Sequence, residues 1–278
     1  MLEIKIQNLN FSYTPEAPIL KNISLTLDHR PTAIIGQNGA GKTTLVKLLK
    51  GLLKPSSGEI MIGNKSTRDF TVAQLAADIG LVFQNPNDQI FKNKVLDEVM
   101  FGPLNIGMSV EVAKIKALES LTQVGLQEKI NENPYDLGLS ERKLIAIASI
   151  LAMDPKVVIL DEPTIAQDYA SKEKIKALIK QLSSQGKIVL TIIHDMDFVA
   201  ECFERTIVLS KGKVLLDGST KEVFTQEAVL KEAYLEMPHV TQLCKQLGYE
   251  ETYLTVEAFI DDLKGILYKD IALPSKVQ

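Results

Sequence analysis

A glycine-rich loop between an expected strand and an expected helix restricts this chain to few folds. Residues Pro31–Ile35 form a short apolar run typical of a buried strand. The next segment reads Gly36-Gln37-Asn38-Gly39-Ala40-Gly41-Lys42-Thr43-Thr44 and matches G-x-x-x-x-G-K-[ST] at every position. Apolar residues then recur at helical spacing from Leu45 to Leu49. The segment therefore predicts a strand, loop and helix of an α/β sheet.

The chemistry of such a loop is phosphate binding. Its glycines let the backbone curl, so that several N–H groups point at phosphate oxygens, and the helix N-terminus adds partial positive charge. Lys42 would neutralise charge on the β- and γ-phosphates, and the hydroxyl of Thr43 can bind Mg²⁺. We expect the whole segment Gly36–Thr44 to bind nucleotide. The alternative, a glycine-rich turn without a ligand, fits poorly with the strand and helix that flank it.

A second apolar strand, Val157–Leu160, ends in two carboxylates. In a phosphate-loop protein, Asp161 at this place is expected to help hold Mg²⁺ through its water shell. Glu162 would point into the same cleft and polarise the attacking water. The alternative is that both are solvated loop charges.

Two further strands also end in polar residues. His194 follows the run that begins at Ile188, and we expect it to contact the γ-phosphate, although a lone histidine is more often structural. Gln84 follows Ile79–Phe83 and can bind Mg²⁺ through its side-chain carbonyl; alone it would be weak evidence.

Composition excludes several classes of protein. The 278 residues are 45% hydrophobic and 24% charged, with a net charge of −4, so no basic surface points to nucleic acid. No apolar run approaches the length of a bilayer span. Met1–Lys5 alternates like a strand and does not resemble a signal peptide. The two cysteines, Cys202 and Cys244, are expected to be reduced structural thiols. Any membrane association is therefore expected to come from a partner.

The phosphate loop, Gln84, Asp161-Glu162 and His194 stand in the order and spacing of an ATP-binding-cassette (ABC) ATPase, and residues 2–218 resemble that family. The resemblance implies ATP and Mg²⁺ as cofactors. It also implies an α/β nucleotide-binding domain over 1–218, with a helical signature subdomain at about 85–153. Antiparallel strands at Leu2–Gln7 and Ser24–Leu27 are expected to form an edge of the sheet.

Two more site residues are implied by the resemblance alone. Tyr13 looks like the aromatic residue that stacks on adenine, the alternative being a core or loop tyrosine. Asp168 looks like the aspartate of the loop that crosses the dimer interface. The preceding Ile165-Ala166-Gln167 departs from the usual Ala/Gly-Leu pattern, which puts that role in doubt.

One stretch resembles a particular group within the ABC ATPases. Residues Phe83–Phe91 read FQNPNDQIF and are similar to FQNPDDQ(I/L)F of energy-coupling factor (ECF) transporter ATPases and related cobalt and nickel importers. The resemblance implies a short extra helix beside the groove that receives a membrane subunit, with Asp88 paired to an arginine of that subunit. Val95–Pro103 resembles a helix of the same family, and Glu111–Leu121 has helical spacing.

The tail carries a weaker likeness to the same family. Glu236–Leu243 resembles its "PP.VT.L" element, with Met237 in place of a proline. We expect residues 219–278 to form a helical extension. It is either a dimer contact or a stabilising extension private to this chain.

The signature motif of the family is degenerate. Leu137-Gly138-Leu139-Ser140-Glu141 stands where the family has Leu-Ser-Gly-Gly-Gln, a loop that holds the γ-phosphate bound by the opposite subunit. Gly138 removes a hydroxyl, Leu139 adds a side chain where the backbone must approach phosphate, and Glu141 adds negative charge. One lost hydrogen bond to a charged group costs about 1.5–3 kcal/mol, or roughly one to two decades of rate. A shifted register, with Ser140 as the helix N-cap, would keep partial function.

We therefore expect the degenerate half of a heterodimeric ATPase on the cytoplasmic face of the cell membrane. Its partners would be a second ABC ATPase with an intact signature, an integral-membrane coupling subunit and a separate membrane substrate-binding subunit, with no nucleic acid. The transported substrate would be a vitamin or another micronutrient. Alternatives are the ATPase of a cobalt or nickel importer, and a nucleotide-gated scaffold with little turnover. An ABC protein of DNA or the ribosome would need coiled-coil insertions or basic linkers, which the chain lacks.

Overall fold

Two β-sheets organise the chain, of which the computed structural model describes residues 2–271. The larger sheet has six strands in the order β10-β9-β3-β8-β7-β6. They are β3 (Thr32–Ile35), β6 (Ile79–Val82), β7 (Val157–Asp161), β8 (Ile188–Ile192), β9 (Arg205–Ser210) and β10 (Lys213–Ser219). The smaller sheet has four strands in the order β2-β1-β4-β5: β1 (Ile4–Ser12), β2 (Pro18–Leu27), β4 (Ser57–Ile62) and β5 (Lys65–Ser66).

The strands of the larger sheet pair in parallel, except for β10, which runs antiparallel to β9. Every residue of β3, β6, β7, β8 and β9 is buried. A parallel sheet is covered on both faces, which is why these strands read as continuous apolar runs. Such runs made the strands predictable from the sequence.

This sheet separates two hydrophobic cores. Along β7, Val158 and Leu160 face the core that includes α3–α6, whereas Val157 and Ile159 face the core under α1 and the smaller sheet. The alternation follows from the two-residue period of a strand. The helices are α1 (Lys42–Leu49), α2 (Val72–Ala76), α3 (Val95–Asn105), α4 (Val110–Gln123), α5 (Leu139–Leu151), α6 (Tyr169–Ser184) and α7 (Met196–Cys202), with 3₁₀ turns η1 (Pro86–Asp88), η2 (Gln127–Lys129) and η3 (Pro134–Asp136).

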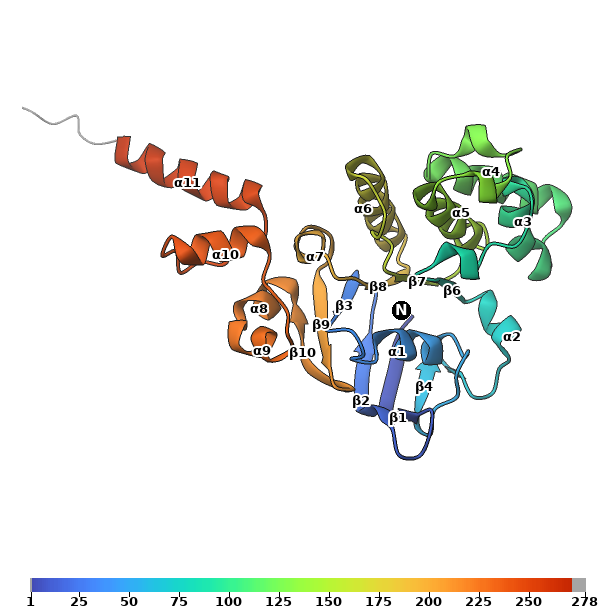
Figure 1. Cartoon of the computed structure of the whole chain (residues 1–278), viewed down its shortest axis with the longest axis horizontal. Helices are drawn as coiled ribbons and strands as arrows, with labels where there is room; N and C mark the ends of the chain where they lie inside the picture. The colour runs from blue at the N-terminus through green and yellow to red at the C-terminus, as the bar shows by residue number, and fades with distance from the viewer. Residues whose placement is uncertain (1, 272–278) are drawn as a thin grey trace, which may run out of the picture.

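The helical subdomain lies beside the sheet, between the end of β6 and the start of β7. Helices α3, α4 and α5 stand together there, drawn in green in Figure 1. Ser109 caps α4 by accepting a hydrogen bond from the N–H of Val112. The short extra helix expected after Gln84 is the single 3₁₀ turn η1, capped by Asn85. The predicted α/β architecture with a helical signature subdomain is thus confirmed.

The antiparallel strands differ from expectation in extent and in pairing. β1 and β2 are longer than predicted. They pair with each other, and β1 also pairs with β4, so neither joins the parallel sheet. The register of β1 shifts between Ile6 and Leu9, around Asn8, whose φ is +46°. This irregularity breaks the two-residue alternation, so the sequence pattern ended the strand too early.

The chain continues as α8 (Thr220–Thr225), α9 (Glu227–Glu232), α10 (His239–Gln246) and α11 (Val256–Ile271), which lie to one side in orange and red in Figure 1. Phe224 and Leu230 belong to the main core. Cys244 and Phe259 belong to a small separate core between α10 and α11. No helix among residues 2–271 combines the length and the apolar character needed to cross a bilayer.

Candidate active site

The glycine-rich loop is fixed between strands of the two sheets. β3 ends at Ile35, the loop begins at Gly36, and Gly41 is the N-cap of α1. A Cβ added to Gly36 would lie 2.1 Å from the carbonyl oxygen of Leu209, and one added to Gly41 would lie 2.6 Å from the side chain of Leu20. Gly41 also has a φ of +102°, where a side chain is strained. The close approach of the backbone therefore requires both glycines.

Parallel strands bring the other motif residues to this loop. Asp161 ends β7 and Glu162 follows it, His194 lies two residues after β8, and Gln84 lies two residues after β6. These strands and β3 are neighbours, so their carboxyl ends share one edge of the sheet. A cavity of about 220 Å³ lies there, lined by Ile19, Asn38, Gly39, Ala40, Gly41, Lys42, Thr43, Thr44, Gln84, Asp161, Glu162, Ile192 and His194.

The oxygen atoms at one side of this cavity fit Mg²⁺. The hydroxyl of Thr43 donates a hydrogen bond to Oδ2 of Asp161 at 3.2 Å, and Gln84 lines the same cavity. A hydroxyl, a carboxylate and an amide oxygen are hard donors of the kind that Mg²⁺ prefers. A single carboxylate is a weak cage on its own, so this donor set suits an ion that arrives with phosphate and water ligands.

Lys42 lies over its own loop. Its Nζ donates to the carbonyl oxygens of Gly36 at 2.6 Å and Gln37 at 3.1 Å. Burial lowers the pKa of Lys42, while the neighbouring Glu162 and Asp161 act in the opposite direction. Lys42 itself lines the cavity, so its ammonium group can attract an anion bound there.

Glu162 has the geometry and the acidity of a general base. It is only 3% exposed, and its φ is +50°, an uncommon conformation for a residue with a side chain. Nε2 of His194 lies 3.1 Å from its Oε1, yet this buried oxygen has no hydrogen-bond partner among residues 2–271. Burial, and then the charge of Asp161, raise the pKa of Glu162 to about 7. A carboxylate near neutral pKa is well matched to accepting a proton.

The pKa of His194 shifts in the opposite direction to that of Glu162. Burial and the charge of Lys42 lower the pKa of His194, which favours the neutral imidazole. It lines the cavity together with Lys42 and lies beside Glu162.

The signature segment keeps the register expected from the alignment. α5 begins at Leu139, and its N-cap is Gly138, which has no side chain to cap the helix. Oε2 of Glu141 accepts a hydrogen bond from the N–H of Gly138 at 3.1 Å. The possibility that Ser140 is the N-cap is wrong, because Ser140 lies inside the first turn of α5. No residue of Leu137–Glu141 lines the 220 Å³ cavity, so the structure does not bring this segment to the chain's own site.

Gly36 and Gln37 of the loop do not line the cavity, and neither do the predicted site residues Tyr13, Asp168 and Asp88. The ring of Tyr13 is 59% exposed and meets Phe11 edge-on, with 4.9 Å between centroids. Asp168 caps α6 by accepting a hydrogen bond from the N–H of Ser171 at 2.8 Å. Asp88 accepts one from Asn85 at 3.2 Å.

Asp88 lines a groove that adjoins the cavity. The groove encloses about 450 Å³ and shares Thr43, Gln84 and Asp161 with the cavity. Its other lining residues are Lys47, Leu52, Leu53, Phe83 and Asn85. An occupant of this groove would therefore touch the same residues that surround the nucleotide loop.

The side chain of Lys143 contacts residues of this site, although the sequence analysis does not predict Lys143 as a site residue. Its side chain is buried, and its Nζ donates to the carbonyl oxygens of Phe83 at 3.0 Å, of Gln84, and of Asp161 at 3.4 Å. Burial lowers the pKa of Lys143 to about 8. The signal in the sequence was a lysine immediately before the apolar helical run that starts at Leu144. A buried ammonium needs such partners.

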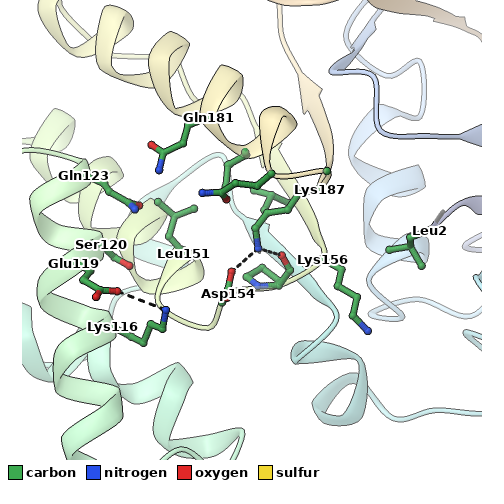
Figure 2. A pocket seen from close by; sticks show the side chains of 15 residues that line it. Leu2, Lys116, Glu119, Ser120, Gln123, Leu151, Asp154, Lys156, Gln181 and Lys187 are labelled. Atoms are coloured by element: carbon green, nitrogen blue, oxygen red, sulfur yellow. Dashed lines mark hydrogen bonds and ion pairs between the residues drawn. The ribbon is translucent and has the colours of Figure 1, made fainter.

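Figure 2 shows a wider cavity, of about 810 Å³, between α4, α5, the end of α6 and the start of β7. Its charges pair with each other. Lys116 lies 3.6 Å from Glu119, and Lys187 lies 2.5 Å from Asp154. It is at the opposite end of β7 from Asp161, far from the gathered motif residues, and we assign it no catalytic role.

Comparison with known proteins agrees with this geometry. A family model described as "ABC transporter" matches residues 20–165. The energy-coupling factor transporter ATP-binding protein EcfA2 of Streptococcus thermophilus is 36% identical over 275 residues, which cover 94% of this chain and 98% of that protein.

Two solved structures are similar in fold and sequence. CbiO1 of Clostridium perfringens, described as part of the ABC transporter complex CbiONQ, is 33% identical with a TM-score of 0.73, covering 87% of this chain and 98% of its own. A dimeric ATP-binding cassette in a post-hydrolysis state, bound to ADP and Pi, is 31% identical with a TM-score of 0.71, covering 78% and 98%.

Proposed function

This chain belongs to the ABC transporter family, as an ATP-binding subunit of the energy-coupling factor type, and we propose that it powers uptake of a vitamin or another micronutrient. It binds ATP and is an ATPase. The observation that carries the proposal is the meeting of Lys42, Glu162 and His194 around one cavity at the carboxyl edge of the sheet. The transported substrate would be bound by another subunit.

The proposed reaction uses the chain's own side chains. The loop N–H groups and Lys42 bind the phosphates, and Thr43, Asp161 and Gln84 hold Mg²⁺. When bound, Mg²⁺ neutralises charge on the phosphate oxygens. Glu162 accepts the proton of a water molecule as its oxygen attacks the γ-phosphorus, and the bridging oxygen leaves with ADP. Lys42 and His194 stabilise the charge that develops on the γ-phosphate.

We place this chain opposite a second ABC ATPase with an intact signature. ATP on this chain's own loop would then face the partner's signature and be hydrolysed, whereas ATP on the partner's loop would face Leu137–Glu141. The bare N-cap at Gly138 and the 40% exposed side chain of Leu139 support a weakened second site. In this arrangement Asp168 is a residue of the dimer interface, and Tyr13 stacks on adenine.

The membrane partner is proposed to occupy the 450 Å³ groove beside the cavity. Asp88 on its rim would pair with a basic side chain of an integral-membrane coupling subunit. A separate membrane subunit would bind the substrate, and this chain would lie peripherally on the cytoplasmic face. The groove shares Gln84 and Asp161 with the cavity, which gives closure of the site a direct route to the membrane subunit.

The extension from residue 219 is proposed as an additional dimer contact. Its helices α10 and α11 carry exposed apolar side chains, namely Leu243, Leu247, Val256 and Ile260. Exposed apolar residues gathered on one element are typical of a surface that another chain covers.

Replacement of the general base tests the assignment of the working site. In the assembled complex, Glu162→Gln should reduce ATP hydrolysis at least about a hundredfold, because the amide cannot accept the proton. Glu16→Gln, in an exposed loop of the same chain, is the matched control and should leave the rate unchanged. Activity near wild type in Glu162→Gln would place the working site on the partner and refute the assignment.

A further inference from the structure

The degenerate signature makes a specific contact within its own chain. The hydroxyl of Ser140, in the first turn of α5, donates a hydrogen bond to Oε1 of Gln167 at 2.9 Å. Nε2 of Gln167 donates in return to the backbone carbonyl oxygen of Ser140 at 3.4 Å. Two side-chain bonds therefore join α5 to the loop between β7 and α6.

Both residues of this pair stand where the sequence departs from the family pattern. Ser140 replaces the second glycine of Leu-Ser-Gly-Gly-Gln, and Gln167 replaces the leucine that usually precedes Asp168. A glycine and a leucine can form neither of the two bonds. The two departures are 27 residues apart in the sequence, yet the hydroxyl bond requires both of them. The second bond requires only Gln167, because its acceptor is the backbone carbonyl of residue 140. At position 140, the departure from the family motif thus supplies the hydroxyl of this contact.

The loop held by this contact carries the catalytic carboxylate. It leaves β7 at Asp161, passes through Glu162 and Ala166 with φ of +50° and +61°, and enters α6 at Asp168. Positive φ at residues with side chains persists only where the surroundings enforce it. The N–H of Gln167 bonds to the carbonyl of Thr164 at 3.2 Å, which closes the turn next to the contact. The Ser140 contact is one of the restraints on this turn.

The same helix also holds the other side of the site. From α5, Lys143 donates to the carbonyl oxygens of Gln84 and Asp161. Helix α5 thus contacts both segments that flank Glu162: the end of β6 through Lys143, and the loop after β7 through Ser140. A shift of α5 relative to the sheet would move one segment against the other.

We propose that Ser140 and Gln167 are positioning residues for ATP hydrolysis, and that their contact couples the degenerate signature helix to the placement of Glu162 in the same chain. In this arrangement the signature has exchanged a contact with the partner's nucleotide for a contact with its own catalytic loop. The catalytic part of the inference rests on the proposed function, because it requires the chain's own site to be the working one.

The contact itself is tested in the isolated chain by amide hydrogen exchange of residues 164–169. Ser140→Ala and Gln167→Leu should each speed exchange there by about two- to tenfold, the effect of one ordinary hydrogen bond. Ser140→Thr keeps the hydroxyl and should restore protection. Ser184→Ala removes a serine bond at the far end of α6 and is the control. Unchanged exchange in both variants would overturn the proposal.

The coupling is tested by steady-state ATPase of the assembled complex. Each single variant should lower kcat by about two- to tenfold, with KM for ATP unchanged because the phosphate loop is untouched. The double variant should be no slower than Gln167→Leu alone, since Gln167→Leu already removes both bonds. Ser140→Thr should recover the wild-type kcat.

The failures of this inference and of the proposed function are distinguishable. If Glu162→Gln abolishes hydrolysis while Ser140→Ala and Gln167→Leu both keep the wild-type kcat, the site assignment stands and the coupling is refuted. If the effects of the two variants add in the double variant, the residues act separately and the coupling is also refuted.

Discussion

One missing hydroxyl separates Gly138 from the serine that the family carries at the N-cap of this helix. The site can accept the side chain, because a Cβ at Gly138 would meet only Oε2 of Glu141, at 3.7 Å, and its φ of −65° is ordinary. The backbone has therefore kept the shape of an N-cap while the capping group is absent. The glycine at this position thus removes a hydrogen-bonding group and leaves the backbone conformation of an N-cap in place.

Gly138→Ser should restore that chemistry. The new hydroxyl can accept a hydrogen bond from the first turn of α5, which should stabilise the chain by a few tenths of a kcal/mol. A regained bond to γ-phosphate should raise ATP hydrolysis by pairs of this chain alone about tenfold. Thermal unfolding and steady-state ATPase of the purified chain measure the two effects. Higher stability with unchanged hydrolysis would show that Leu139 or Glu141 limits this site.

Lys143 shows what a sequence motif leaves out. Its carbonyl partners on Phe83 and Gln84 lie 60 and 59 residues away, so its place before an apolar helical run does not reveal which groups it contacts. Asp161 and His194 are easier to place, because each lies at or just after the end of a buried strand and parallel strands align their ends. Lys42 is easier to place because it belongs to the glycine-rich motif at the start of α1. A local sequence pattern predicts where a residue lies along a strand. The contacts of a long side chain that reaches from α5 to the ends of β6 and β7 depend on tertiary packing.

Lys143→Met should destabilise the chain by about 1–3 kcal/mol, because it leaves buried carbonyl oxygens without a donor. Lys143→Gln retains one donor group and should lose less. Urea unfolding of the isolated chain, compared at constant m-value, gives the difference. Equal midpoints for wild type and Lys143→Met would mean that water replaces the ammonium group at no cost.

Strands that consist of a continuous apolar run are predicted well from the sequence, whereas a strand with an irregular register is not. β7 and β8 read directly from the sequence because both of their faces are buried. β1 was predicted too short because its register shifts around Asn8. Its pairing with β4 joins residues that are 47 (Asn10 and Ser57) to 58 (Ile4 and Ile62) positions apart in the sequence, and no local pattern encodes it.

Helix α10 is tied to α7 by a pair that titrates. The backbone N–H of His239 donates to Oδ1 of Asp197 at 2.8 Å, and its Nδ1 contacts Oδ2 of the same carboxylate. The hydrogen bond and charge of Asp197 hold the pKa of His239 above its usual value of 6.5. α7 begins two residues after His194, so the tie connects the extension to an element at the edge of the active site.

Docking of α10 should therefore weaken as pH rises. Because the pKa of His239 is higher in the folded chain than in the unfolded one, its contribution is complete below pH 6.5 and is lost as pH passes the raised value. Hydrogen exchange of residues 239–246 across this range measures the change. Asp197→Asn should remove the pH dependence, and His239→Gln should behave likewise. A profile that is identical in wild type and Asp197→Asn would contradict the role of the pair.

The whole molecule offers separate surfaces for separate partners. The groove at Asp88 is lined by the segment after β6 and by residues of α1 and the turn after it, whereas the signature lies at the amino end of α5. The exposed apolar residues of α10 and α11 lie on a third part of the chain, to the opposite side in Figure 1. Contacts with the membrane subunit and with the second ATPase should thus be separable by mutation.

Purification of this chain from its own membranes tests that separation. Wild type should bring along a second ABC ATPase and a multi-span membrane subunit. Asp88→Asn should reduce recovery of the membrane subunit severalfold and leave the second ATPase, because only the groove has lost its charge. Asp97→Asn, exposed on α3 of the same subdomain, is the control. A homodimer free of both partners would favour the scaffold alternative.

The bare N-cap at Gly138 also bears on surplus copies of the chain. In the proposed pair, unequal synthesis of the two ATPases would leave some copies of this chain to associate with each other. In such pairs, each bound ATP would face a helix N-terminus that lacks the serine hydroxyl. The pairs would therefore bind ATP and hydrolyse little of it. An excess of this subunit would then consume almost no ATP, so the cell need not synthesise the two ATPase subunits in closely matched amounts.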